Sequence, residues 1–234
     1  MNRPYVICHM TISVDGKVTG DFLNAERSKA GIEEYYRINR EFKADAFACG
    51  RVTMEESFTG GYYPDLSKYA DAKIDRTVYI SAAEADAKRY AVSFDRHGKL
   101  GWKTPYIEDS DPGYGGSHVI QVMCEDVSDA YLAYLRVVGV SYIFAGETEM
   151  DLHVALNKLN GLFGIESLLL EGGSIINGAF YNANLVDEIS LVVLPVSALK
   201  GDRTLFNDNT GRKFKMKSST VLKKGVAWIR YERG

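Results

Sequence analysis

Short apolar runs of strand length alternate with segments whose apolar residues recur at helical spacing. The runs expected to form strands lie at residues 5–13, 44–49, 77–81, 118–123, 140–145, 166–170 and 188–194. The first run is apolar almost throughout, which is typical of a strand buried on both faces of a sheet. Strands that alternate with helices predict an α/β fold with a mostly parallel sheet, and the tail at 218–231 predicts an antiparallel hairpin.

Helices are predicted between these strands by apolar stripes at intervals of three or four residues. The two clearest stripes are Ile32, Tyr35, Ile38 and Phe42, and then Leu152, Ala155, Leu156 and Leu159. Residues 128–138 predict another helix with Ser128 as its N-cap, and Thr148 with Asp151 resembles a capping box. A further short helix is expected after residue 173.

Nothing in the 234 residues indicates a boundary between domains. There is no internal repeat, no low-complexity segment and no linker, so we expect one domain over residues 1–234. The stretch 95–117 is irregular, and a loop of that length in a compact domain is usually functional or mobile. Trp102 and Tyr106 are its candidates to face a ligand.

The charge pattern excludes some partners. The formal net charge is −3 and the basic residues are scattered, so no nucleic-acid surface is expected. The longest apolar runs are strand-sized, so no membrane segment is expected, and the first residues, MNRPYVICHM, lack the pattern of a signal peptide. Cys8, Cys49 and Cys124 form no CxxC pair, which favours a cytoplasmic protein. The four histidines show no metal-ligand spacing, so no metal is expected.

Two glycine-containing turns follow predicted strands and open predicted helices. The first is Gly50-Arg51-Val52-Thr53 and the second is Glu171-Gly172-Gly173-Ser174. A helix that starts at a strand's end presents free N–H groups and a positive dipole end to a phosphate. Two such sites at the carboxyl ends of strands indicate a dinucleotide, although no GxGxxG fingerprint is present.

Each of these residues also has a purely structural interpretation. Taken alone, this motif favours the structural interpretation, with Gly50 as a simple turn and Thr53 as an N-cap. Glu171 is compatible with holding the glycine turn by accepting backbone hydrogen bonds. Asp15 lies in a polar Asp-Gly turn, a common feature that gains interest from its place at the same expected sheet edge. His9, inside the first strand, is a candidate either for catalysis or for the core.

The order of these motifs resembles one family. Ser13-Val14-Asp15-Gly16, then ADAFACGRVTME, TVYIS, LLLEGGSIINGAF, LVDEISLVVLP and a final Gly with Leu-Phe resemble the reductase domain of the bifunctional riboflavin-biosynthesis deaminase-reductase. The resemblance covers about residues 3–206. It implies a dihydrofolate-reductase-like, three-layer α/β/α fold with a mostly parallel central sheet and a C-terminal antiparallel hairpin.

The resemblance also implies a cofactor, NADPH, and roles for individual residues. Gly50, Arg51 and Thr53 match positions that hold the NADPH phosphates, and Ser81 matches a position near the 2′-phosphate. Gly172, Gly173, Ser174 and Ile175 match the segment beside the pyrophosphate and nicotinamide, with Glu171 preceding them. Asp15 and His9 match positions near the substrate, and they are the candidate catalytic residues. A homodimer is implied as well.

Three departures from the family affect the substrate. Gly20-Asp21-Phe22-Leu23-Asn24 stands where the family usually has an SxW-type segment that helps to build the substrate site. His9 stands where the family usually has a lysine that reaches the substrate, and Glu55-Glu56-Ser57-Phe58 replaces the family's Asp-Asp-Pro-x-Leu element. The expected function is therefore an NADPH-dependent reductase resembling 5-amino-6-(5-phosphoribosylamino)uracil reductase, which transfers hydride to a C=N or C=O carbon of a small molecule. The alternatives are a reductase of a pterin, folate-like or other heteroaromatic compound, and an NADPH-binding protein without turnover.

Overall fold

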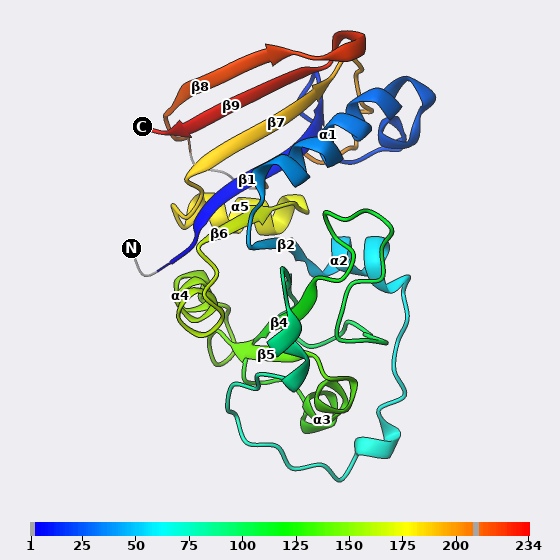
Figure 1. Cartoon of the computed structure of the whole chain (residues 1–234), viewed down its shortest axis with the longest axis vertical. Helices are drawn as coiled ribbons and strands as arrows, with labels where there is room; N and C mark the ends of the chain where they lie inside the picture. Colours follow the sequence, from blue (N-terminus) through cyan, green and yellow to red (C-terminus); the bar gives the residue numbers. More distant parts are fainter. Residues whose placement is uncertain (1–2, 208–210) are drawn as a thin grey trace. The chain divides into compact units, whose positions relative to one another are not determined.

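The computed structural model describes residues 3–207 and 211–234 and divides the chain into two compact units (Figure 1). Unit 1 consists of Asp45–Glu166 together with the described residues before Tyr5, and unit 2 consists of Tyr5–Ala44 and Ser167–Gly234. Within the described ranges, no helix has the length and apolar character needed to cross a membrane.

Unit 1 contains four parallel strands in the order β5-β4-β3-β2. They are β2 (Ala46–Gly50), β3 (Tyr90–Phe94), β4 (His118–Met123) and β5 (Ser141–Phe144). Its helices are α2 (Arg51–Met54), which continues into the π-helical turn η3 (Glu55–Thr59), α3 (Asp129–Val138) and α4 (Leu152–Phe163), with short 3-10 turns η4 (Ser67–Tyr69) and η5 (Ala82–Asp86).

The irregular stretch 95–117 of unit 1 is anchored by a buried polar network. Asp95, at the end of β3, accepts hydrogen bonds from the backbone N–H of Leu100 (2.9 Å) and from Gln121 of β4 (2.9 Å). Gln121 accepts in turn from the indole N–H of Trp102 at 3.0 Å, and Trp102 is only 4% exposed. The polar atom of Trp102 is thus used inside the unit, while the residue also lines a small pocket; that it faces a ligand stays a prediction.

Unit 2 contains five strands in the order β6-β1-β7-β9-β8, of which the last two are antiparallel. They are β1 (Tyr5–Ser13), β6 (Ser167–Leu170), β7 (Glu188–Leu194), β8 (Phe214–Val221) and β9 (Ala227–Arg233). Its helices are α1 (Lys29–Phe42) and α5 (Ser174–Asn182), with 3-10 turns η1 (Asp21–Asn24), η2 (Glu26–Ser28) and η6 (Lys223–Gly225).

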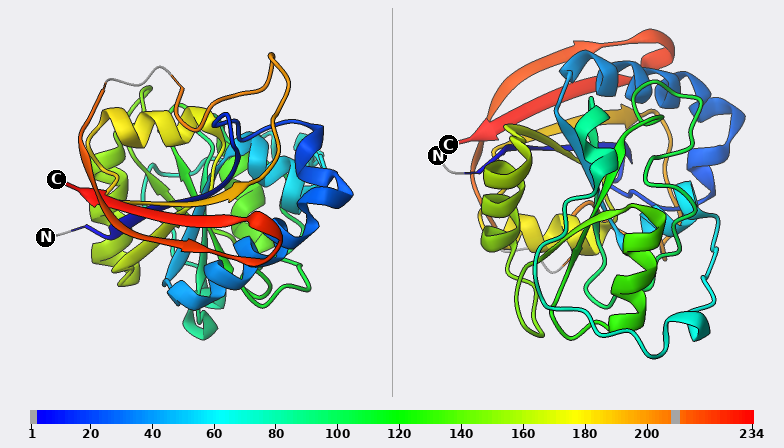
Figure 2. Two further views of the ribbon diagram at one scale, coloured as in Figure 1. Left: turned by 90° about the horizontal axis from the view of Figure 1, so that it is seen from above. Right: turned by 60° about the horizontal axis from the view of Figure 1, so that its bottom comes forward.

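Helices α1 and α5 cover opposite faces of the unit 2 strands (Figure 2, left). Under α1, buried Ile38 packs with Val192 and Leu194 of β7 and with Val226. Gly31 of α1 makes this close packing possible, because a Cβ atom there would lie 1.9 Å from a methyl carbon of Leu194. The strand edges that carry loops to the candidate site are thus fixed by a dense apolar layer.

Most predicted elements are present, but the third predicted strand is wrong. Residues 77–81 make only an isolated antiparallel bridge, between Tyr79 and Tyr142 of β5, while the strand beside β2 is Tyr90–Phe94. The segment Tyr90–Phe94 is buried almost throughout, whereas Ile80 is 43% exposed. At the start of α4 the N-cap is Asp151, whose carboxylate accepts from two backbone N–H groups, so Thr148 does not open the helix.

Candidate functional site

The end of β2 in unit 1 turns directly into a helix. Gly50 is the N-cap of α2, with extended backbone (φ −74°), and Arg51 is the first helical residue. The guanidinium of Arg51 pairs with Glu55 one turn later, and Glu55 also accepts a hydrogen bond from Tyr63. Thr53 is partly exposed in the same first turn. Arg51 therefore has a carboxylate partner within its own helix, at a helix end suited to anions.

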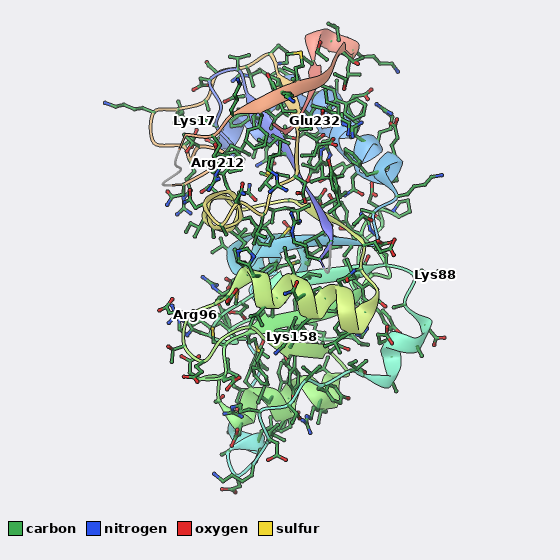
Figure 3. The ribbon with its side chains drawn as sticks, turned by 90° about the vertical axis from the view of Figure 1, so that its left-hand side faces the viewer. Lys17, Lys88, Arg96, Lys158, Arg212 and Glu232 are labelled. Carbon is green, nitrogen blue, oxygen red and sulfur yellow. The ribbon has the colours of Figure 1, made fainter. Side chains whose placement is uncertain are left out.

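The neighbouring strand β3 brings a second set of charged groups to this edge. The register aligns Gly50 with Phe94, so Asp95 and Arg96 follow β3 beside the start of α2. Figure 3 shows Arg96 and Lys88 on opposite sides of unit 1, as expected for residues after and before β3. Burial raises the pKa of Asp95, and the hydrogen bonds that it accepts and the nearby charge of Arg51 partly offset this effect.

Ser81 lies elsewhere in unit 1. Its backbone N–H donates to the hydroxyl of Ser141, the first residue of β5, at 3.0 Å, and its own hydroxyl caps η5. The hydroxyl of Ser141 is also 2.8 Å from Nε2 of His118, the first residue of β4. Ser81 is thus placed at the amino ends of the parallel strands, opposite to the end that carries Gly50 and Arg51. The structure does not bring Ser81 together with these residues.

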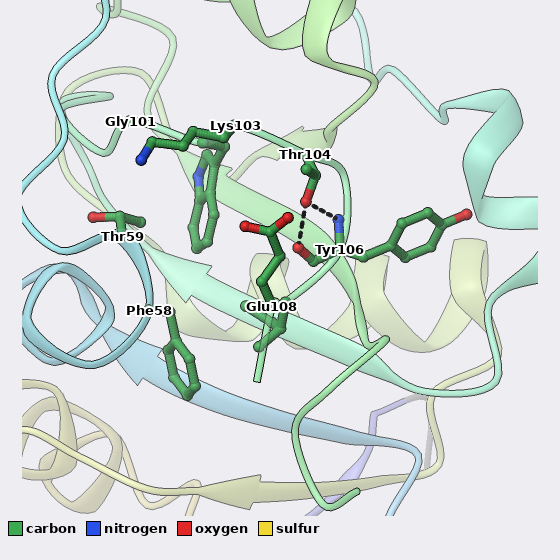
Figure 4. Close-up of a pocket in the computed structure, with 9 residues that line it drawn as sticks. Phe58, Thr59, Gly101, Lys103, Thr104, Tyr106 and Glu108 are labelled. Atoms are coloured by element: carbon green, nitrogen blue, oxygen red, sulfur yellow. Dashed lines mark hydrogen bonds between the residues drawn. The ribbon is translucent and has the colours of Figure 1, made fainter. Parts of the chain in front are cut away.

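Unit 1 also has a small pocket of about 60 Å³ beside the irregular stretch (Figure 4). Lys103, Thr104 and Glu108 lie around it, and Tyr106, a predicted ligand-facing residue, is among its lining residues. The hydroxyl of Tyr106 donates to the carbonyl of Ala83 at 2.6 Å. A space of this size holds a few water molecules, so it is too small for a nucleotide.

In unit 2, β6 leads through two glycines into the N-terminus of α5. Gly172 has φ 105°, a conformation that favours glycine, and Gly173 is the N-cap. Ser174 is 3% exposed, and its hydroxyl has no hydrogen-bond partner among the described residues. The next residue, Ile175, is 62% exposed. This helix start thus combines free N–H groups, an unpartnered hydroxyl and an exposed apolar side chain.

Glu171 precedes these glycines and lies against α1. Its carboxylate accepts a hydrogen bond of 2.7 Å from the amide of Asn39, and both residues are buried. Burial raises the pKa of the Cys8 thiol, and the negative charge of Glu171 raises it further. The contact with Asn39 gives Glu171 a structural role in holding the end of β6 to α1.

Asp15 follows β1 and connects two loops at the same edge of unit 2. Its Oδ1 accepts a hydrogen bond of 3.0 Å from the backbone N–H of Ala198, and the N–H of Val14 donates to the carbonyl of Val196. The bond from Ala198 lowers the pKa of Asp15, helped by Ser13. A carboxyl group with a lowered pKa carries no proton at neutral pH, so the free protein presents Asp15 as a carboxylate.

His9 is completely buried within unit 2. Its ring stacks on Tyr35 at 4.5 Å, Nε2 is 3.2 Å from the carbonyl of Tyr35, and Nδ1 is 3.0 Å from the hydroxyl of Ser190. Burial lowers the pKa of His9 to about 4. Both ring nitrogens have internal partners and no solvent reaches the ring, so the geometry supports the core interpretation and not proton transfer to a substrate.

Sequence reasoning missed an apolar feature of this edge. Val14, Ile175 and Leu199 are each more than 60% exposed, and they follow β1, β6 and β7, which are adjacent in the sheet. Exposed large apolar side chains at one edge are typical of a surface that binds a ligand. The motif formed by Gly201 and Leu205-Phe206 indicated the loop region that contains Leu199. The sequence pattern alone does not show which residues this loop contacts.

Comparison with known proteins agrees with this architecture. Residues 115–228 match the family described as the RibD C-terminal domain. The chain is 26% identical over 210 residues to the 2,5-diamino-6-ribosylamino-4(3H)-pyrimidinone 5′-phosphate reductase of Methanothermobacter thermautotrophicus, covering 89% of this chain and 86% of the relative. It is 29% identical over 202 residues to the reductase of the same name from Aquifex aeolicus, covering 84% and 79%.

Solved structures show the same fold at lower identity. A pyrimidine reductase-like protein from Corynebacterium diphtheriae superposes with a TM-score of 0.68 at 16% identity, covering 99% of this chain and 92% of that one. The riboflavin biosynthesis reductase of Saccharomyces cerevisiae gives 0.65 at 12% identity, covering 100% and 91%. The predicted resemblance is confirmed: this chain is similar to reductases of the riboflavin pathway and has their α/β fold.

Proposed function

We propose that this chain is an NADPH-dependent reductase whose substrate is 2,5-diamino-6-ribosylamino-4(3H)-pyrimidinone 5′-phosphate. The observation that carries the proposal is the similarity, over 84–89% of the chain, to two reductases named for this compound. The open-chain imine form of the ribosylamino group would accept a hydride at carbon and a proton at nitrogen, giving the ribitylamino product.

The start of α5 fits the phosphates of such a cofactor. When bound, the nicotinamide would supply the hydride. The N–H groups at the helix start and the unpartnered hydroxyl of Ser174 are suited to donate hydrogen bonds to a phosphate oxygen, and the glycines Gly172 and Gly173 leave room for close approach. The exposed side chain of Ile175 gives a planar ring an apolar surface. Glu171 positions this segment through its bond to Asn39.

The start of α2 is the second proposed phosphate-binding segment. Gly50 allows the turn, Thr53 offers a hydroxyl, and Arg51 offers a guanidinium that now pairs with Glu55. Because that pair is partly exposed, exchanging the carboxylate for a phosphate costs little. Arg51→Ala is expected to raise the Kd for NADPH, and Glu55→Gln is a matched variant that keeps the arginine.

The proton at nitrogen is proposed to come from solvent water. His9 is enclosed by Tyr35 and Ser190, and Asp15 is a carboxylate at neutral pH. The proposed role of Asp15 is to position the loop after β7, through the N–H of Ala198, beside the substrate. A water molecule beside this loop would donate the proton, so no buried acidic side chain is needed.

The decisive experiment is turnover with defined substrates. Purified protein is mixed with NADPH and the diaminopyrimidinone compound, and loss of absorbance at the nicotinamide band is followed. Oxidation of NADPH with formation of the ribitylamino product would support the proposal. Turnover only with 5-amino-6-(5-phosphoribosylamino)uracil, or only with a pterin or folate-like compound, would identify that compound as the substrate in place of the diaminopyrimidinone. Tight NADPH binding with no turnover on any of them would favour a binding protein.

A homodimer through the C-terminal hairpin is also proposed. Strand β8 ends the unit 2 strand order, and nearly all of its residues are exposed, including Met216 (60%) and Val221 (82%). An unpaired strand edge needs covering, and a second copy of the chain is the proposed cover. Sedimentation at micromolar concentration would show a dimer, and a clean monomer would refute this part of the proposal.

The cysteines fit the proposed location in the cytoplasm. Cys8, Cys49 and Cys124 are all buried and free of disulfides. Burial raises the pKa of Cys8 and of Cys124, which keeps these thiols protonated and unreactive. Such thiols act as small apolar core groups, as expected in a reducing compartment.

A further inference from the structure

Residues 199–207, the strap, follow β7 in unit 2 and are bound to the loop after β1. The backbone N–H of Val18 donates to the carbonyl of Arg203 at 2.8 Å. The N–H of Arg203 donates in turn to the hydroxyl of Thr19, also at 2.8 Å. The middle of the strap is therefore fixed to the loop that carries Asp15.

The far end of the strap rests on α5. The N–H of Asn207 donates to the carbonyl of Ser174 at 3.1 Å. The ring of Phe206 stacks on that of Tyr181, with the ring centroids 4.3 Å apart. Gly178 permits this close approach, because a Cβ atom there would lie 2.3 Å from the carbonyl oxygen of Asn207. The strap thus joins the loop after β1 to the helix whose start is the proposed cofactor-binding segment.

Asn177 of α5 is completely buried beside these contacts. Its side-chain amide N–H donates to the carbonyl of Leu205, in the strap, at 3.4 Å. Its Oδ1 atom is also buried and has no hydrogen-bond partner among the described residues. An unpartnered buried acceptor is destabilising, so stability alone would favour an apolar side chain at this position. The contact with the strap accounts for the presence of an amide.

The strap begins at the surface where exposed apolar side chains gather. Leu199, its first residue, is 70% exposed, and its N–H donates to the carboxylate of Asp202 at 2.9 Å. Ala198, immediately before the strap, donates its N–H to Asp15. A displaced strap would therefore move both the side chain of Leu199 and the loop of Asp15.

We propose that Asn177 is a positioning residue for the substrate, because it holds the strap that fixes the loops of Asp15 and Leu199. This inference rests on the proposed function and deepens it. A strap that is already ordered lowers the entropy cost of binding, so the substrate meets a preformed surface. Asn177 is completely buried, so it acts through the strap and not by contact with the substrate.

The test compares the steady-state kinetics of the wild type, Asn177→Ala and Asn160→Ala with NADPH and the diaminopyrimidinone substrate. Asn177→Ala is expected to raise the KM for this substrate on the order of tenfold, while kcat stays within a few-fold and the Kd for NADPH within about twofold. Asn160→Ala is the matched control in unit 1, since this amide also donates to a backbone carbonyl, that of Ile165 at 3.0 Å. The control should leave the KM unchanged.

Amide hydrogen exchange gives a readout that does not depend on turnover. In Asn177→Ala, the N–H groups of Val18 and Asn207 are expected to exchange on the order of tenfold faster, because local opening of the strap becomes easier. Asn160→Ala should leave both groups as in the wild type. If Asn177→Ala does not fold, Phe206→Leu loosens the same strap from a partly exposed position and should give the same pattern.

The outcomes separate the inference from the proposed function. Unchanged exchange of the strap would overturn the holding role of Asn177. Faster exchange with an unchanged substrate KM, or an equal rise in the substrate KM and the Kd for NADPH, would overturn its role for the substrate while leaving the reductase intact. A wild type that does not turn over this compound would instead overturn the proposed function itself.

Discussion

Replacing His9 with glutamine separates the catalytic interpretation of this residue from the core interpretation. The hydroxyl of Ser190 accepts from the indole N–H of Trp228 at 2.9 Å, so its hydrogen points to Nδ1 of His9. Nε2 then carries the ring proton and donates it to the carbonyl of Tyr35. This assignment, inferred from the partners, makes His9 a neutral ring with both nitrogens satisfied.

The size of the expected effect on the free energy of unfolding follows from the lowered pKa of His9. The unfolded chain protonates His9 near pH 6.5, whereas burial holds the pKa in the folded protein at about 4. Between these values the unfolded state binds an extra proton, so the free energy of unfolding falls as pH falls, by about 1.4 kcal/mol per pH unit. The full window corresponds to about 3 kcal/mol, and stability above pH 6.5 is unaffected by this group.

The assay is urea unfolding of the wild type and His9→Gln between pH 7.5 and 4.5. Loss of the stacked ring is expected to cost about 1–3 kcal/mol at pH 7.5. This difference should shrink as pH falls, by about 2 kcal/mol at pH 5, because glutamine does not titrate. Buried His118, whose pKa is also lowered to about 4, contributes equally to both proteins and cancels. Exposed His153→Gln is the matched control, and its stability at pH 7.5 should stay within about 0.5 kcal/mol of the wild type.

The kcat of His9→Gln distinguishes the core interpretation from the catalytic one. If His9 lies in the core, kcat of the folded His9→Gln protein stays within a few-fold of the wild type at neutral pH. A fall of 100-fold or more, with the stability slope unchanged, would refute the core interpretation, since general acid catalysis is worth that much.

The remaining predictions concern other parts of unit 2 and the packing of helices. Asp15→Asn keeps the acceptor for Ala198, so kcat should change only a few-fold; loss of one limb of the pH–rate profile would instead identify Asp15 as the proton donor. Ser174→Ala should raise the Kd for NADPH about tenfold with an unchanged Tm, since its hydroxyl has no partner among the described residues. Gly31→Ala should destabilise by about 1–3 kcal/mol through its clash with a buried methyl group, while Gly161→Ala, with open space, should not; equal Tm values would contradict this packing.

Strand positions were predictable where burial on both faces leaves a continuous apolar run. The bounds predicted for 5–13, 118–123 and 188–194 agree with β1, β4 and β7, whose residues are almost all buried. The helix stripes were predictable for the related reason that α1 and α4 each bury one face. Long-range partners were not predictable, because the bond of Asp15 to Ala198 joins residues 183 positions apart.

Ser81 shows how a local sequence pattern places a candidate site residue at the wrong end of the strands. Residues 77–81 have strand-like composition, so the motif order placed Ser81 at the carboxyl end of a strand. Composition decides whether a segment suits an extended backbone, but competition for the place beside β2 decides which segment becomes the strand. Tyr90–Phe94 takes that place, since its side chains are buried there. The segment that pairs with β2 also determines which residues lie at the carboxyl ends of these strands. Asp95 and Arg96 therefore lie there, and Ser81 does not.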